Sequence, residues 1–149
     1  MFPKPKATIA IAQQSPYACI FAVNMACIPV MSTERGIARK QQALLARQLF
    51  KRLGIKGVSV TAPNYSMAQS VHVSLPEIAR EQGDYLYAGT DYRNHCYSDM
   101  PLEVPARAKA NAKHQAELRI GEILDRAFPN HDNRSDYQTD YFDSCWSIN

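Results

Sequence analysis

The chain has 149 residues, of which 46% are apolar and 21% charged, and its formal net charge is +3. This length is typical of one domain, and the apolar content suffices for a core, so a wholly disordered chain is excluded. The four cysteines lie far apart without a CxxC pair, which predicts neither a zinc knuckle nor a compact disulfide framework. We therefore expect a single domain in a reducing cytoplasm, with no metal and no cofactor.

The first thirty residues combine basic and apolar stretches that loosely imitate a secretion signal. Polar residues and prolines interrupt both apolar stretches, and the second, at 17–30, is shorter than the roughly twenty residues that span a bilayer. We therefore expect no contact with a membrane, but one or two buried strands at Ala7–Ala12 and Ala18–Val23. As an alternative, the domain starts at Met31, and residues 1–30 are an N-terminal extension of it.

The segment 32–53 is predicted to form an amphipathic helix. Ser32 is a suitable N-cap and Gly54 a suitable stop. On a helical wheel the apolar residues fall on one arc, which predicts a buried side opposite a basic one. The buried arc comprises Ala38, Leu45, Ala46, Leu49, Phe50 and Leu53, and the basic side comprises Lys40, Arg47 and Lys51.

Two short segments with alternating apolar and polar residues predict strands, at Val58–Ala62 and Ser70–Leu75. The residues between them suffice for a hairpin loop, so the strands are expected to pair antiparallel and to pack their valines on the helix. A brief helical turn is expected at Pro76–Gly83, and a third strand at Tyr85–Tyr87.

Helical periodicity returns at Ala106–Phe128, and Pro129 ends it. The tail begins as a polar loop and is expected to close with a strand within Tyr141–Ile148. The order of elements predicts an α+β fold, an antiparallel sheet with two main helices packed on one face. The apolar stripe of the second helix comprises Ala116, Ile120, Ile123, Leu124 and Ala127.

The first candidate binding surface is the basic stretch that contains the first helix. Seven Lys or Arg occur between Arg35 and Lys56, and Glu34 is the one neighbouring acid. Such a stretch neutralises phosphates or meets an acidic protein, although Lys and Arg are also good helix formers on a solvated face. The candidate partner-binding residues are Arg35, Arg39, Lys40, Arg47, Lys51 and Arg52.

The second candidate surface is acidic and aromatic. Closely spaced carboxylates can imitate phosphates, and tyrosines anchor interfaces or stack on bases, but loop capping and core packing explain the same residues. The candidate partner-binding residues in the tail are Asp132, Asp136, Tyr137, Asp140, Tyr141 and Asp143. A further group of tyrosines comprises Tyr85, Tyr87, Tyr92 and Tyr97.

No local motif predicts catalysis. The sequence contains no Gly-x-Ser-x-Gly elbow and no phosphate-binding glycine loop. His72, with a serine two residues later, matches one half of a paired His-x-Ser/Thr element, but no second half exists, so a strand histidine on a polar face is the simpler interpretation. An enzyme assembled from dispersed residues, with His72 and His131, is a third hypothesis.

Four segments resemble a known family. They are the helix end Phe50-Lys-Arg-Leu-Gly-Ile, the strands Val58-Ser-Val-Thr and Ser70-Val-His-Val-Ser, and the late segment Ala127-Phe-Pro-Asn-His-Asp-Asn-Arg-Ser-Asp-Tyr-Gln-Thr-Asp-Tyr-Phe-Asp. Together they resemble a large polyvalent protein-associated domain of phages and conjugative elements. The likeness covers about Arg39–Leu75 and Glu117–Ile148, while the hairpin loop and the segment after Leu75 depart from that domain's Gly-rich loop and Trp-Thr-Asp-Gly-type segment.

The resemblance implies an origin in a mobile genetic element and assigns no catalytic residue. It favours a non-enzymatic, anti-CRISPR-like counter-defence protein that binds a host defence protein or nucleoprotein complex in the cytoplasm. The alternative is a nucleic-acid-binding accessory protein of a phage or plasmid. A homodimer is compatible with an exposed edge strand formed by the N-terminal segment.

Overall fold

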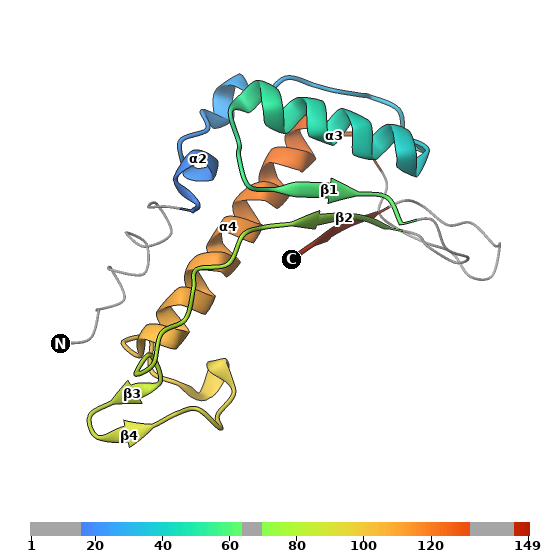
Figure 1. Ribbon diagram of the computed structural model, residues 1–149. Coiled ribbons are helices and arrows are strands. Elements are labelled where there is room, and N and C mark those ends of the chain that lie inside the picture. Colours follow the sequence, from blue (N-terminus) through green and yellow to red (C-terminus); the bar gives the residue numbers. More distant parts are fainter. Residues whose placement is uncertain (1–15, 64–69, 132–144) are drawn as a thin grey trace. The chain divides into compact units, whose positions relative to one another are not determined.

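The computed structural model describes residues 16–63, 70–131 and 145–149 (Figure 1). The expected strand at 7–12 and the acidic candidates between 132 and 143 lie outside these residues. The chain divides into two compact units. Among the described residues, the first unit comprises 16–22 and Pro76–Leu118, and the second comprises Val23–Leu75 and Arg119–Asn149.

The first main helix, α3, spans Arg39–Leu53 in the second unit, so it begins later than Ser32. Instead of capping the helix, the Ser32 hydroxyl accepts the N–H of Glu34 at 3.1 Å in a local turn, and such a bond competes with helix formation. At the other end Gly54 adopts the left-handed conformation, φ 76°, and ends the helix as predicted.

The buried side of α3 matches most of the predicted arc. Ala46, Leu49 and Phe50 are buried, and Leu45 and Leu53 are half-buried. Ala38 is exposed, because it precedes the helix as its N-cap. Gln42 is also fully buried, although its polar side chain predicts exposure.

The sheet of the second unit has the strand order β1-β2-β5 (Figure 1). The predicted hairpin is confirmed, because β1 (Ser59–Thr61) and β2 (Ser70–Ser74) pair antiparallel with Val60 opposite Val73. The closing strand β5 (Cys145–Ile148) is also present, but it runs parallel to β2. A long connection that includes a helix separates β2 from β5, and only such a connection permits parallel pairing. The α+β class is therefore confirmed with a mixed sheet.

The N-terminal part of the chain departs from the prediction. Where a strand was expected at 18–23, the first unit has a short helix, α2 (Ala18–Phe21). Tyr17 and Ile20, three residues apart, are both fully buried, and this spacing places them on one side of a helical turn. In the second unit a 3-10 turn, η1 (Met25–Cys27), follows, and the Asn24 side chain caps it.

The rest of the first unit contains a small hairpin of β3 (Leu86–Tyr87) and β4 (Thr90–Asp91), followed by the 3-10 turn η2 (Tyr97–Asp99). The third strand expected at Tyr85–Tyr87 is thus present, but it belongs to its own two-stranded sheet. The prediction of a helical turn at Pro76–Gly83 is wrong, since no helix forms there.

The second main helix, α4, spans Pro105–Ala127, close to the predicted bounds. Proline suits the first position of a helix because the N–H that it lacks would have no partner there. Each member of the predicted apolar stripe, from Ala116 to Ala127, is fully buried. Among the described helices, none combines the length and the apolar character that a membrane crossing requires.

Candidate binding surface

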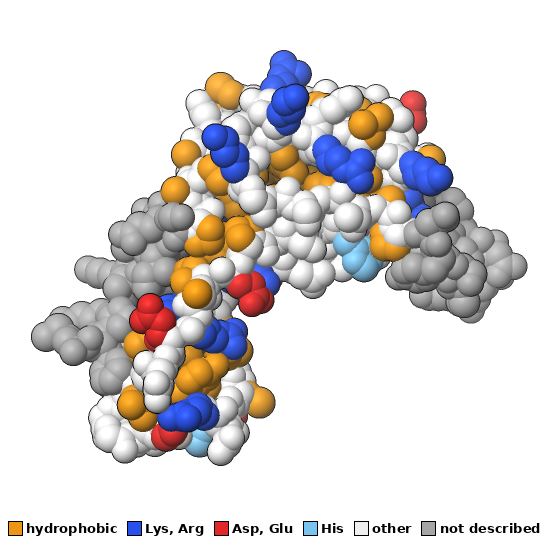
Figure 2. All heavy atoms as spheres, in the orientation of Figure 1, with side chains coloured by type: hydrophobic (Ala, Val, Ile, Leu, Met, Phe, Trp, Pro, Cys, Tyr) orange, Lys and Arg blue, Asp and Glu red, His pale blue; other side chains and the backbone are white. Residues whose placement is uncertain are grey.

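A line of exposed residues runs along α3, and we call it the basic stripe: Lys40, Leu44, Arg47 and Lys51. Positions three or four residues apart lie on the same side of a helix, so these four side chains are neighbours. Leu44 is 44% exposed between its basic neighbours. Figure 2 shows Lys and Arg side chains spread over the region of α3, with hydrophobic side chains between them.

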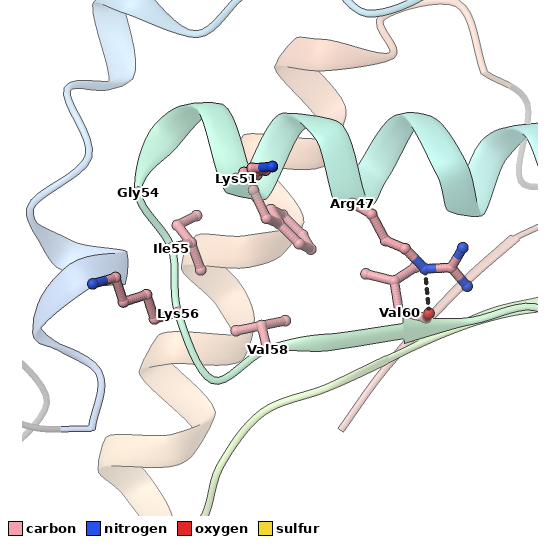
Figure 3. Close-up of a pocket in the computed structure, with 8 residues that line it drawn as sticks. Arg47, Lys51, Gly54, Ile55, Lys56, Val58 and Val60 are labelled. Atoms are coloured by element: carbon pink, nitrogen blue, oxygen red, sulfur yellow. Dashed lines mark hydrogen bonds between the residues drawn. The ribbon is translucent and has the colours of Figure 1, made fainter.

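The cations of the basic stripe are not neutralised by any described acid. Lys40 and Lys51 make no hydrogen bond or ion pair with another described residue. Arg47 donates its Nε–H to the carbonyl oxygen of Val60 on β1 at 2.9 Å (Figure 3). This bond orients the guanidinium without removing its charge, and it covers a carbonyl on the outer edge of β1.

The structure separates the other predicted basic residues from the stripe. Arg39 is half-buried and donates to the Pro63 carbonyl at 2.6 Å, so it connects the start of α3 to the residues that follow β1. Arg52 is exposed, but it follows Lys51 and therefore lies about 100° around the helix from it. Arg35 is exposed in the turn before the helix. Three of the six candidates thus share one face.

A pocket with a cavity volume of about 250 Å³ lies at the end of the basic stripe (Figure 3). It is formed by the last turns of α3, the residues after its cap, and β1. Among the described residues that line the pocket, the charged ones, Arg47, Lys51 and Lys56, are all basic. Its lining residues are Arg47, Phe50, Lys51, Gly54, Ile55, Lys56, Val58 and Val60.

The sequence patterns did not predict this pocket, although one feature pointed to it. Gly54 donates its N–H to the Lys51 carbonyl at 3.2 Å, and Ile55 donates to the Phe50 carbonyl at 2.9 Å. In such a cap the residue after the glycine packs back on the helix. Ile55 accordingly has 6% of its surface exposed, and the chain that leaves it forms a wall of the pocket.

Charge is unevenly divided between the two units. The described residues of the second unit include nine Lys or Arg but three Asp or Glu, namely Glu34, Glu122 and Asp125. Those of the first unit include five Lys or Arg and seven Asp or Glu. The positive charge of the described chain is therefore concentrated in the unit that carries the basic stripe.

The candidate interface anchors of the first unit are half-buried, namely Tyr85, Tyr87, Tyr92 and Tyr97. They pack against a core cluster of Met100, Val104 and Ala106. The Arg80 guanidinium lies 4.7 Å from the ring centroid of Tyr97, and it donates to the Tyr85 hydroxyl at 3.3 Å. Hydrogen bonding to Tyr97, and then to Arg80, lowers the pKa of Tyr85. Core packing thus accounts for much of their surface.

The two histidines of the third hypothesis lie on opposite faces of the sheet. Val60 lines the pocket beside α3 and stands opposite Val73, so the valines of the sheet face the helix. His72 alternates with them and points to the other face. His131 instead lies on the helix side, with its Nε2 at 3.2 Å from the Gln42 amide nitrogen. The structure does not bring these histidines together.

No group of three or more His, Cys, Asp or Glu within the described ranges could hold a metal ion. Comparison with protein-family models, curated proteins and solved structures gives no significant match to this chain. The resemblance to a domain of phages and conjugative elements therefore stays a prediction from the sequence.

Proposed function

We propose that the protein acts by binding a negatively charged macromolecule through the basic stripe of α3. The observation that carries this proposal is the line of Lys40, Arg47 and Lys51, which are exposed on one side of the helix without a described acid to neutralise them. Cations held on a rigid helix create a local positive potential that attracts and orients an anionic partner. No catalytic step is needed for this activity.

The setting that we propose is counter-defence in a host cell, where the protein inhibits a CRISPR-type complex by binding it. The sequence resemblance supports this setting, and the basic stripe supplies the binding surface. Such complexes combine proteins with nucleic acids, and a basic helix docked on them would block access of target DNA by its bulk and its charge.

The experiment mixes the purified protein with candidate defence effectors, each loaded with its guide, and measures co-elution and cleavage of target DNA. We expect one effector to co-elute and to lose cleavage. The variant Lys40→Glu with Lys51→Glu should lose both effects. The matched control, Arg52→Glu with Arg93→Glu, removes the same net charge at two exposed residues that are not part of the stripe and should keep them.

The proposal fails if no effector co-elutes and none loses cleavage. It also fails if both double variants behave alike, because the position of the charges would then be irrelevant. Circular dichroism of each variant establishes that the fold is retained.

The second candidate function is that of a nucleic-acid-binding accessory protein. Its support is the length of the stripe, since Lys40 and Lys51 are about 16 Å apart along a helix that rises about 1.5 Å per residue. This length spans several phosphates of one strand. Binding to free duplex DNA should then weaken with salt, and the stripe variant should reduce the salt slope by about one for each phosphate that it no longer neutralises. Absent or salt-insensitive binding excludes this candidate.

A further inference from the structure

We propose that the pocket at the end of α3 receives an apolar side chain from an acidic peptide segment of the partner, while the carboxylates of that segment contact the basic stripe. This inference rests on the proposed function, because it names the chemistry of the partner for the same face. It predicts a partner segment in which acidic residues flank one large apolar residue.

The size and lining of the pocket suit an apolar side chain. Phe50, Ile55 and Val60 are 3%, 6% and 5% exposed, and the half-buried Val58 completes the apolar wall. A cavity of about 150 Å³ lined by such residues is large enough to bind benzene. The volume here is about 250 Å³, so the side chain of a leucine or phenylalanine fits.

The border of the pocket suits carboxylates. Lys51 and Lys56 line it together with Arg47, whose Nε–H is bound to Val60 and whose terminal nitrogens bond to no other described residue. A guanidinium oriented in this way binds a carboxylate through charge-assisted hydrogen bonds. In the cap of α3, the N–H groups of Gly54 and Ile55 donate to the carbonyl oxygens of Lys51 and Phe50. These oxygens would otherwise repel an anion.

The same lining disfavours a nucleotide base as the occupant. Bases bind to proteins by stacking on exposed aromatic rings and by hydrogen bonds to their edges. The one aromatic residue of the lining is Phe50, which is buried, and the other walls are aliphatic. A peptide that offers an apolar side chain and carboxylates therefore matches both the lining and its charge.

The test uses fluorescence polarisation with labelled synthetic peptides and the full chain. The probe is a nonapeptide of Asp and Glu with a central Leu. One control peptide carries Ala at the centre, and another keeps the Leu but replaces the acids with Asn and Gln. A single-stranded oligothymidine of equal length is the nucleic-acid arm. We expect the probe to bind about tenfold more tightly than either control peptide and more tightly than the oligonucleotide.

Substitutions in the protein locate the binding. Lys51→Glu should weaken binding of the probe by about tenfold, whereas Arg52→Glu, in the same helical turn but outside the lining, should change it little. Val58→Trp fills the pocket and should abolish the preference for Leu over Ala. Val58→Thr keeps the shape of the side chain but makes it polar, and it replaces Val58→Trp in the test if the larger residue prevents folding. It should reduce the preference for Leu over Ala several-fold.

The outcomes separate the pocket from the proposed function. Equal binding of the Leu and Ala peptides, or binding that Val58 variants do not affect, overturns the inference and leaves the basic stripe as a charged surface. Tighter binding of the oligonucleotide also overturns it. If none of the peptides binds, the inference about the pocket is also overturned. The effector experiment with the Lys40 and Lys51 variant tests the proposed function independently.

Discussion

The Asp84 carboxylate shows how single residues hold the irregular part of the first unit. It is 7% exposed and lies 2.8 Å from the Lys109 ammonium on α4. It also accepts the Glu81 N–H at 2.8 Å, and Lys109 donates to the Ala79 carbonyl at 2.9 Å. The segment before Asp84 therefore follows these bonds rather than a helical path, which explains why the predicted helical turn is absent.

We expect Lys109→Met to lower the free energy of unfolding by about 3–5 kcal/mol, because it leaves a buried carboxylate without its counter-charge. Urea denaturation followed by circular dichroism measures this loss. Lys113→Met is the control, since its partner Glu77 has 70% of its side chain exposed and the change should cost little. Equal losses from the two variants would show that burial does not determine how much these ion pairs contribute to stability.

Tyr17 leads to a prediction about alkaline pH. Burial, and then the nearby charges of Glu77 and Glu117, raise its pKa from 10.0 to about 12. The folded chain thus keeps a proton that the unfolded chain releases above pH 10, so its contribution to stability is complete below pH 10 and is lost as the pH rises towards 12.

Tyr17→Phe should remove that part of the pH dependence. It also removes the hydrogen bond from the Tyr17 hydroxyl to the Pro76 carbonyl, which is 2.8 Å long, so stability at neutral pH should fall by about 0.5–1.5 kcal/mol. Denaturation midpoints of both proteins, compared on either side of pH 10, measure the two effects. An unchanged pH dependence in the variant would contradict the assignment to Tyr17.

At the scale of elements, the sequence predicted both long helices because their 3.6-residue periodicity is local. The predicted start of α3 at Ser32 was wrong, because the Ser32 hydroxyl accepts a hydrogen bond within a turn that comes before Arg39. The short α2 was taken for a strand, since four residues are too few to show a period. The end of α3 was predicted correctly, and its cap also builds the pocket.

Gly54→Ala should lower the free energy of unfolding by about 1–2 kcal/mol, because a side chain is disfavoured at its φ of 76°. Gly36→Ala is a matched control, since an added Cβ at either glycine meets nothing within 4 Å, and Gly36 lacks the positive φ. Thermal melts of both variants measure the difference. A similar loss at the two positions would argue against backbone conformation as the cause.

For the whole molecule, the division of charge matters more than the net charge of +3. Among the described residues, positive charge is concentrated in the second unit, and the basic stripe within it has no described acid as a partner. A surface of this kind interacts with anions through its local potential, so two variants of equal net charge can behave differently.

We therefore expect the wild-type protein to bind a sulfonate cation exchanger. Lys40→Glu with Lys51→Glu should elute at lower salt than Arg52→Glu with Arg93→Glu, although both variants have the same net charge. The salt concentration at elution is the measurement. Identical elution would mean that the chain carries no dominant basic face.

The sequence by itself determined the α+β class, both long helices, the β1–β2 hairpin and the basic side of α3. These features depend on periodicity and on caps, which are properties of neighbouring residues. Only the tertiary structure decided that β5 runs parallel to β2, that Arg39 holds the hairpin rather than joining the stripe, and that Ile55 and Val58 form a pocket beside Lys51. Each of these depends on packing between segments distant in sequence or on the path of the chain after a cap, and no local pattern encodes such packing.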